Sequence, residues 1–299
     1  MVGAAEGTRA LMTRILVVGA GGMLGRDLMS ELGDLNVEGL AKKDLDIRDS
    51  TQVAEAVSGF DVVINAAAYT KVDDAETNVE LAFGVNATGA ENLALGTAAT
   101  NAHLVQISTD YVFDGRAQTP YSEDSPTHPL SVYGKTKRDG ENAVMNLNPR
   151  FSIVRTAWLY GENGPNFPRT VARLGREREF LEVVDDQIGQ PTSTIDVARL
   201  IRALILSGNP SGVFHATNSG ATSWWKFAQV LFEKAGWDPT RVRPISSAEF
   251  VRPAPRPNWS VLGHDRWEAC GLRAPRPWEE ALEEAWTHYL KGVFEEHRE

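Results

Sequence analysis

The sequence contains a single cysteine, Cys270, among 299 residues. One cysteine excludes an internal disulfide and a cysteine-based metal cluster, and it suits a reducing compartment, so we expect a cytoplasmic protein. We interpret Cys270 itself as a small buried residue. Long apolar runs are absent as well, because none approaches the ~20 residues that a membrane-spanning helix needs. The sequence therefore predicts no membrane partner.

Basic residues are in short supply. The 30 lysines and arginines face 40 aspartates and glutamates, which gives a formal net charge of −10. A protein that binds nucleic acid needs a basic surface to displace counterions, so we expect no nucleic-acid partner. The 6 histidines are scattered without the spacing of metal ligands, and we predict no metal site from them. The expected partner is a small molecule.

The most informative stretch runs from Arg14 to Leu28. Four apolar residues, 15–18, predict a buried strand, and the glycines that follow predict a tight turn that opens a helix. Such a turn brings backbone N–H groups and the positive end of a helix against a pyrophosphate, as in dinucleotide-binding folds. The cofactor contacts predicted here are Gly19, Gly21, Gly22, Met23, Leu24 and Gly25.

Strand-like and helix-like segments then alternate along the chain. We predict strands at 36–40, 45–47, 61–65 and 103–107 and helices at 78–100 and 132–147. This alternation predicts an α/β fold with a Rossmann-like, doubly wound parallel sheet, whose ligands lie at the carboxyl ends of the strands.

The segments after the second and third predicted strands are candidates for the adenosine end of the cofactor. Lys42 and Lys43 favour NADPH, since a base there accepts a 2′-phosphate, although they are also consistent with a solvated surface loop. Asp46 and Ile47 are expected near the adenine. After residues 61–65, small side chains allow a cofactor to approach the backbone; the residues are Ala66, Ala67 and Ala68, followed by Tyr69.

Hydroxyl groups follow the strand at 103–107. Thr109 can hydrogen-bond a carbonyl oxygen in the ligand crevice, or it can simply cap the strand end. Tyr133 and Lys137 are four residues apart on one helix face. An ammonium beside a phenol favours the phenolate, so we expect Lys137 to lower the pKa of Tyr133 and make it a proton donor near neutral pH.

These features, in this order, resemble the extended short-chain dehydrogenases that act on nucleotide sugars, and more narrowly the dTDP-4-dehydrorhamnose reductase family. The resemblance runs from about Arg14 to about Trp286. Its motifs are residues 65–76 (NAAAYTKVDDAE), 108–113 (STDYVF), 133–137 (YGKTK), 155–160 (RTAWLY) and 186–192 (DQIGQPT). Two departures touch no catalytic role: Val18 precedes the first glycine where threonine is common, and Ala157 stands where some members have serine.

The resemblance implies a role for each matching residue. Tyr133 is the proton donor, Lys137 holds the nicotinamide ribose, and Thr109 hydrogen-bonds the reacting sugar oxygen. The residues implied to bind substrate are Thr109, Asp110, Tyr111, Trp158, Asn166, Gln187, Arg252 and Arg256. The two arginines lie in a proline-rich loop that the family places near the substrate diphosphate, where a guanidinium suits phosphate oxygens; an exposed basic connector is the alternative.

The resemblance implies NADPH-dependent reduction of the C4 keto group of dTDP-4-dehydro-β-L-rhamnose, the last step of dTDP-rhamnose biosynthesis. NADH is a possible second cofactor. A sugar-nucleotide epimerase or dehydratase and a non-catalytic NADP-binding regulatory subunit remain open. Asp110-Tyr111 argues against a dehydratase, because dehydratases commonly have an Asp-Glu pair there. A role for Mg²⁺ cannot be determined from the sequence, and monomer or homodimer stays open.

The predicted domain organisation has three parts. Residues 1–12 are expected to be a disordered extension. Residues 13–160 form the dinucleotide-binding domain, to which the chain returns near 193–215. Residues 161–299 form a smaller substrate-binding domain, with helices at 169–178, 193–206 and 278–290 and a late strand at 213–215.

Overall fold

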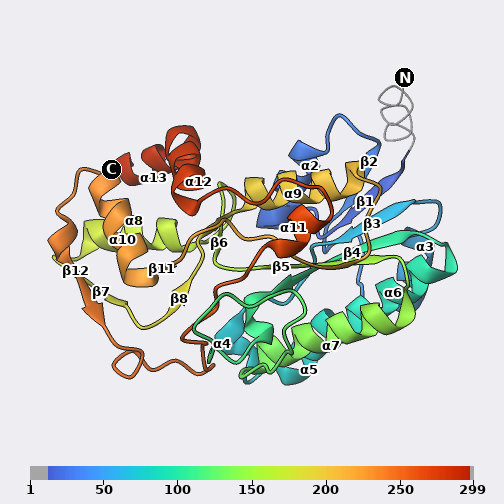
Figure 1. Ribbon diagram of the computed structural model, residues 1–299, viewed down its shortest axis with the longest axis horizontal. Helices are drawn as coiled ribbons and strands as arrows, with labels where there is room; N and C mark the ends of the chain where they lie inside the picture. Colours follow the sequence, from blue (N-terminus) through green and yellow to red (C-terminus); the bar gives the residue numbers. More distant parts are fainter. Residues whose placement is uncertain (1–12, 297–299) are drawn as a thin grey trace.

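The computed structural model describes residues 13–296; the predicted extension at 1–12 lies outside the described residues. A six-stranded parallel sheet, in the order β10-β5-β4-β3-β1-β2, dominates the first half (Figure 1). Its strands are β1 (Ile15–Val18), β2 (Val37–Leu40), β3 (Val62–Asn65), β4 (His103–Thr109), β5 (Phe151–Thr156) and β10 (Gly212–His215). The predicted parallel, doubly wound fold is confirmed.

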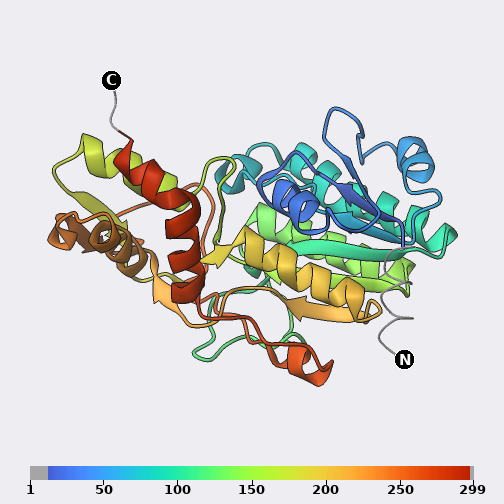
Figure 2. The ribbon, with the colours of Figure 1, turned by 90° about the horizontal axis from the view of Figure 1, so that it is seen from above.

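Helices cover both faces of this sheet (Figure 2). One face packs against α2 (Met23–Glu31) and α9 (Thr194–Leu206) in a core that contains Leu28 and Ile201. The other face packs against α3 (Ser50–Ala56), α6 (Gly89–Ala99) and α7 (Val132–Leu147). The predicted long helix at 78–100 is a continuous helical run of α5 (Val79–Phe83), a π-helical turn η1 (Gly84–Thr88) and α6.

The second half has its own apolar core, with the fully buried Phe227 and Phe232 inside it. Its helices are α8 (Phe167–Glu177), α10 (Trp224–Lys234), α12 (Trp278–Ala285), the π-helical turn η4 (Trp286–Leu290) and α13 (Lys291–Glu295). Its strand pairs are β6 (Leu159–Tyr160) with β9 (Thr192–Ser193), β7 (Leu181–Val184) with β12 (Val242–Ile245), and β8 (Ile188–Gly189) with β11 (Thr222–Ser223). The short elements α4 (Val72–Ala75), α11 (Asp265–Ala269) and the 3₁₀ turns η2 (Asp110–Val112) and η3 (Pro239–Arg241) complete the fold.

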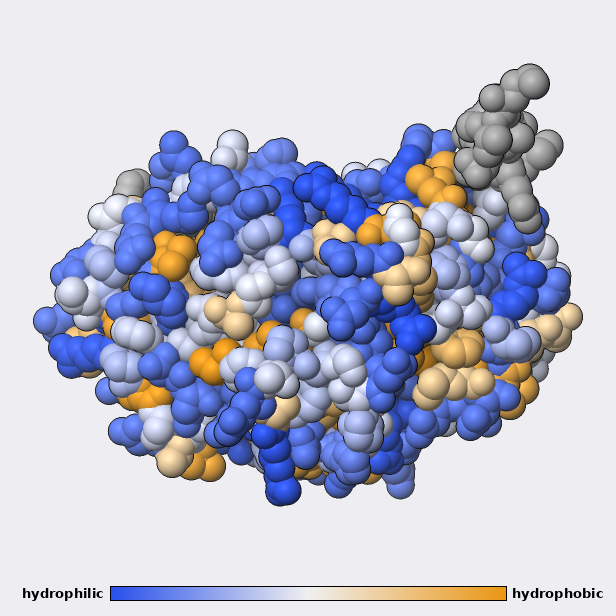
Figure 3. Space-filling view, viewed as in Figure 1, coloured by the Kyte–Doolittle hydropathy of each residue, from blue (hydrophilic) through white to orange (hydrophobic). Residues whose placement is uncertain are grey.

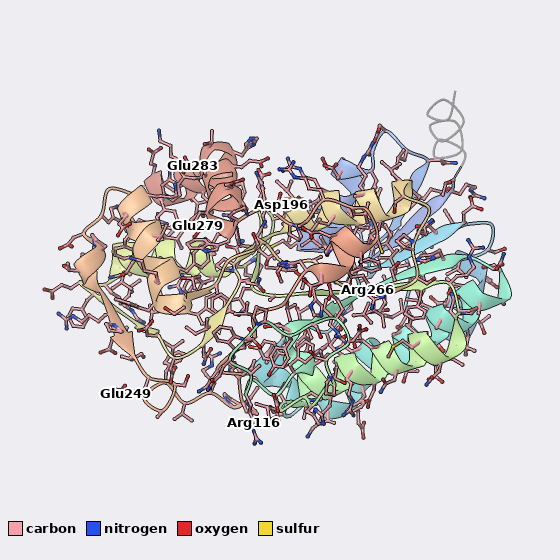
Figure 4. The ribbon with its side chains drawn as sticks, viewed as in Figure 1. Arg116, Asp196, Glu249, Arg266, Glu279 and Glu283 are labelled. Atoms are coloured by element: carbon pink, nitrogen blue, oxygen red, sulfur yellow. The ribbon has the colours of Figure 1, made fainter. Side chains whose placement is uncertain are left out.

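The chain passes between the two halves repeatedly. Besides α9 and β10, the late helix α11 returns to the first half, where Trp267 packs edge-on against Phe214. An ion-pair network joins the halves: Asp196 of α9, labelled in Figure 4, accepts from Arg276 at 2.8 Å, and Glu284 of α12 accepts from Arg199 at 2.7 Å. The two halves are therefore held together by the several passages of the chain between them and by these ion pairs.

Two sequence predictions are wrong. Residues 45–47 form a loop and not a strand; the buried side chains of Leu45 and Ile47 pack against the sheet, but no neighbouring strand pairs with them. Cys270 is exposed, because it ends α11 at the surface. Across residues 13–296, no helix combines the length and apolar character needed to cross a bilayer. The face in Figure 3 is mainly hydrophilic, with apolar side chains scattered over it.

Candidate active site

The glycine turn between β1 and α2 is built so tightly that side chains are excluded from it. Gly19 has a φ of 85°, and a Cβ there would lie 2.6 Å from the backbone nitrogen of Ala67. A Cβ on Gly25 would lie 2.2 Å from the carbonyl oxygen of Gly19. No side chain caps the N-terminus of α2, which leaves its first N–H groups for an anion. This geometry fits the pyrophosphate of a dinucleotide.

A cavity of about 610 Å³ opens beside this turn. It gathers most of the predicted cofactor residues, namely Gly19, Gly21, Gly22, Lys42, Asp46, Ile47, Ala66, Ala67, Ala68 and Tyr69. Lining residues that the sequence interpretation did not assign to the site are Val18, Ala41, Leu45, Arg48, Leu81 and Val85. Lys43 lines it as well. The cavity volume and the small alanine side chains at 66–68 suit the adenosine and diphosphate part of the cofactor.

The other predicted cofactor residues of α2 do not line this cavity. Leu24 and Gly25 are buried against the sheet, where they set the position of the helix. Met23 is half-buried, and its sulfur lies 3.9 Å from the amide nitrogen of Asn166, at the junction of the two halves. Any contact of Leu24 or Gly25 with a cofactor has to come from the backbone, whereas the half-buried Met23 can also contact it through its side chain.

The cavity is rich in positive charge. Lys42, Lys43 and Arg48 line it together with one carboxylate, Asp46. Arg48 donates to both oxygens of Asp46, from Nη2 at 2.6 Å and from Nε at 2.9 Å, and this hydrogen bonding lowers the pKa of Asp46 to about 2. The net charge of the four side chains is positive, which favours a cofactor with an additional phosphate.

Buried amides fix the loop that follows β3. The side chain of Asn65 donates to Gln106 at 2.8 Å and accepts from the backbone of Ala67 at 3.1 Å. Asn86, in the π-helical turn, accepts from the backbone N–H of Tyr69 at 2.8 Å and donates to Thr136 of α7 at 3.0 Å. These bonds connect the cofactor cavity to the helix that carries the tyrosine and lysine.

Thr109, Tyr133 and Lys137 meet at the carboxyl end of β4. Ser131 caps α7 by accepting from the N–H of Gly134 at 3.1 Å, and this cap places Tyr133 in the first turn. Lys137 follows one turn later and donates to the carbonyl of Ile107, in β4, at 2.6 Å. Tyr133 is 9% and Lys137 3% exposed. A proton donor and a buried cation therefore stand together beside a hydroxyl group.

The charge states differ from the sequence expectation. Burial raises the pKa of Tyr133 to about 12, and the hydroxyl of Thr109 lowers it only in part. Burial also lowers the pKa of Lys137 to about 8. The prediction of a lowered Tyr133 pKa is wrong for this structure, because burial of the phenol raises that pKa and the charge of Asp110 acts in the same direction.

Asp110 and Tyr111 lie next to this group. Asp110 is 2% exposed, accepts from the Thr109 hydroxyl at 2.9 Å and leaves Oδ2 without a partner. Burial raises its pKa to about 6. The ring of Tyr111 meets that of Tyr133 edge-on, with centroids 5.6 Å apart. The orphan carboxylate oxygen is a candidate acceptor for a substrate hydroxyl.

The remaining predicted substrate residues are held in different ways. Trp158 stacks on Trp224 with ring centroids 3.6 Å apart and is only partly buried, which leaves it able to contact a sugar. Asn166 caps α8 by accepting from Arg169 at 3.1 Å and donates to the carbonyl of Gly161 at 2.7 Å, so both ends of its amide have partners within the protein. The amide of Gln187 donates to Ser247 at 2.8 Å.

Arg252 and Arg256 both point to one carboxylate, Asp73 of α4. Arg252 donates from Nε at 3.0 Å, and Arg256 donates from both terminal nitrogens at 3.0 Å. Both arginines are therefore paired, but the Arg252 side chain is still 44% exposed, so the alternative of an exposed basic connector stays open. Whether the arginines also meet a diphosphate stays a prediction.

The sequence interpretation missed a buried ion pair that joins α7 to the central sheet. Glu141 is one turn after Lys137, and its two oxygens accept from Arg155 of β5 at 2.8 and 2.9 Å. The side chains are 1% and 4% exposed. The negative charge of Glu141 acts to raise the pKa of Lys137 against the effect of burial.

Comparison with known proteins identifies relatives of the whole chain. A dTDP-4-dehydrorhamnose reductase of Streptomyces griseus is 48% identical over 281 residues, which cover 91% of this chain and 92% of that protein. A Streptomyces antibioticus protein described as a probable dTDP-4,6-dihydroxy-2-methyloxan-3-one 4-ketoreductase is 46% identical, with 93% of this chain and 96% of that protein covered. The crystal structure of dTDP-4-dehydrorhamnose reductase from Bacillus anthracis, in complex with NADP, is similar with a TM-score of 0.88 and 39% identity, covering 92% of this chain and 99% of that one. The model of the family described as RmlD substrate binding domain matches residues 12–291. This range contains the glycine turn, the tyrosine–lysine pair and the arginine loop. The chain therefore belongs to this family.

Proposed function

We propose that the protein is an NADPH-dependent reductase that converts the C4 keto group of dTDP-4-dehydro-β-L-rhamnose to the hydroxyl of dTDP-β-L-rhamnose. The observation that carries the proposal is the meeting of Thr109, Tyr133 and Lys137 at the end of β4, in the fold that holds the glycine-turn cavity. The names of the relatives from Streptomyces griseus and Bacillus anthracis support it.

In this mechanism the cofactor supplies the hydride, and the protein supplies position and a proton. When substrate binds, the Thr109 hydroxyl turns its single proton from Asp110 to the sugar carbonyl oxygen, and this hydrogen bond polarises the C4 carbon. The phenol of Tyr133 then gives its proton to that oxygen as negative charge develops on it. Because burial raises its pKa to about 12, Tyr133 carries its proton over the whole physiological pH range.

Lys137 has a binding role in this proposal. Its ammonium has three donors, and one is used on the carbonyl of Ile107 at 2.6 Å. The other two are available to the hydroxyls of the nicotinamide ribose. Lys137 would thereby hold the ribose of the cofactor beside Tyr133, where the nicotinamide would supply the hydride.

We assign the cofactor as NADPH, with NADH as a weaker second, because Lys42, Lys43 and Arg48 surround the adenosine end of the cavity. The complex of the Bacillus anthracis enzyme with NADP supports this choice. Within residues 13–296 there is no group of three potential metal ligands, and the proposed mechanism gives Mg²⁺ no part.

The test is the loss of reduced-nicotinamide absorbance when the purified protein meets NADPH and dTDP-4-dehydrorhamnose, repeated with NADH. We expect one NADPH consumed for each dTDP-rhamnose formed. An epimerase or dehydratase, which recycles its cofactor, gives product without net NADPH loss. A regulatory subunit binds NADPH and gives no product, and either result refutes the proposal.

A second substrate follows from the relative in Streptomyces antibioticus, whose description names a different 4-keto sugar. The same assay with other dTDP-4-keto-6-deoxy sugars decides between them. If one of these sugars has a higher kcat/KM than dTDP-4-dehydrorhamnose, that sugar becomes the assigned substrate. The assigned reaction, reduction of a 4-keto group, stays the same.

A further inference from the structure

Asp73 is surrounded by hydrogen-bond donors from a segment almost 180 positions later in the chain. It accepts from Nε of Arg252 at 3.0 Å, from the second nitrogen Nη2 of the same guanidinium, from the backbone N–H of Ala254 at 3.2 Å and from two nitrogens of Arg256 at 3.0 Å. Figure 1 shows this segment, in orange, running from β12 to the side of α4. One carboxylate thus fixes both arginines of the loop.

The charges of the three side chains Asp73, Arg252 and Arg256 do not cancel one another. Two guanidinium groups share one carboxylate, so the cluster keeps a net positive charge. The side chains of Asp73 and Arg256 are each 20% exposed and that of Arg252 is 44% exposed, so part of the positive charge faces solvent. Hydrogen bonding to Arg256 holds the pKa of Asp73 well below its usual range, which keeps the carboxylate ionised.

This cluster is connected to the catalytic group by direct contacts. Arg256 interacts electrostatically with the phenol of Tyr111. The ring of Tyr111 lies edge-on to that of Tyr133, with centroids 5.6 Å apart. The arginines therefore lie next to the catalytic group, separated from Tyr133 by the ring of Tyr111.

We propose that Asp73 is a positioning residue for substrate binding, which holds Arg252 and Arg256 ready as a preformed receptor for the diphosphate of a nucleotide sugar. The inference rests on the proposed function, because that function supplies the diphosphate. Asp73 touches neither the cofactor nor the reacting atoms, and it acts through the arginines.

The expected effect follows from the ordering of two long side chains. Without Asp73 each arginine moves freely and must be immobilised when substrate binds, at a cost in conformational entropy. Immobilising two such side chains lowers the affinity by a factor of about 5 to 150. If Asp73 instead competed with the diphosphate for the two arginines, its removal would strengthen substrate binding. The two ideas therefore predict opposite changes in affinity.

The experiment compares Asp73→Asn with Asp124→Asn in the full-length protein. Asp124 pairs with Arg266 at 2.9 Å and is 85% exposed, so its variant removes an equal charge from an arginine pair away from the site. Calorimetry measures the Kd of dTDP alone and of NADPH alone, and steady-state kinetics separates KM for the sugar nucleotide from kcat. We expect Asp73→Asn to raise the Kd of dTDP and KM about tenfold or more, with kcat and the Kd of NADPH unchanged and with Asp124→Asn like wild type.

Unchanged or tighter dTDP binding overturns the proposal, and so does an equal loss of NADPH affinity, which indicates a general structural defect. If Asp73→Asn does not fold, Asp73→Glu serves in its place; it keeps the charge but moves it by one methylene, and we expect an intermediate loss of dTDP affinity. A further check compares the double variant Arg252→Gln, Arg256→Gln with the triple variant that also carries Asp73→Asn. The two should bind dTDP equally, because Asp73 acts only through the two arginines. Dependence of dTDP binding on Asp73 in a protein that reduces no 4-keto sugar refutes the proposed function and leaves this inference standing.

Discussion

Replacing Gly25 by alanine tests whether the close packing of α2 on the glycine turn is what creates the cofactor site. The added Cβ would lie 2.2 Å from the carbonyl oxygen of Gly19 and 2.8 Å from Cα of Ala20. Both neighbours are backbone atoms, so no side chain can rotate away and the helix itself has to move by about 1 Å to reach ordinary contact distance.

The magnitude is the difference of two opposing effects. Overpacking of this kind costs about 1–3 kcal/mol, and alanine within a helix regains about 1 kcal/mol relative to glycine. We expect a net destabilisation of up to about 2 kcal/mol, which lowers the Tm by several degrees in a protein of this size. The effect on the cofactor is larger, because the N–H groups of the turn and of α2 must point to the same phosphates, and we expect the Kd of NADPH to rise by tenfold or more.

Calorimetry of NADPH binding and a thermal melt measure the two effects. The matched control is Gly292→Ala in α13, where no atom lies within 4 Å of the added Cβ; it should bind NADPH normally and melt at the same temperature or slightly higher. NADPH affinity in Gly25→Ala equal to wild type would refute the reasoning, since it would mean that the cofactor does not depend on this turn.

Three further predictions concern the catalytic helix. Tyr133→Phe removes the proton donor and should lower kcat by at least about 100-fold, with NADPH affinity unchanged in a direct titration; kcat within a factor of a few of wild type contradicts the assigned role. Because burial lowers the pKa of Lys137 to about 8, the lysine loses its charge as the pH rises past that value, and kcat/KM for NADPH should fall above about pH 8 in a pH–rate profile; Lys137→Arg should move this fall to higher pH, and a profile flat to pH 10 excludes the lysine as its source. Breaking the buried pair by Glu141→Gln leaves Arg155 uncompensated and should cost about 3–5 kcal/mol in a denaturant titration, whereas Glu141→Met combined with Arg155→Met should recover most of the loss; equal instability of both variants argues against the pair as the cause.

The fold and the centre of the site were predictable because their signals are local. The strand at residues 15–18, the glycines that follow it and the four-residue spacing of Tyr133 and Lys137 each occupy a short stretch, and each has a direct meaning for backbone geometry. Residues 45–47 show the limit of such signals. Their alternating burial is what a strand produces, yet an extended loop that packs two apolar side chains against a sheet produces the same pattern without hydrogen-bond partners.

The long-range pairings were not predictable. Asp73 meets Arg252 across 179 residues of sequence, and the partner of Glu141 lies on a different element. The pKa of Tyr133 had the wrong sign because the sequence shows the spacing to a lysine but not the depth at which the phenol is buried. Arg48 was overlooked because its meaning depends on the loop that folds it back beside Lys42 and Lys43 at the cavity wall.

The repeated crossing of the chain between the halves has a consequence for how the protein is made. The core around Leu28 is completed by Ile201 and Trp267, so the dinucleotide-binding half cannot close until most of the polypeptide has left the ribosome. Cleavage of the chain at one position therefore does not release a half with a complete core. Grafting one continuous C-terminal segment from a relative, to exchange substrate specificity, would also replace part of the core of the dinucleotide-binding half. Variation in specificity within such an architecture has to arise from substitutions in place, at loops such as the one that Asp73 holds.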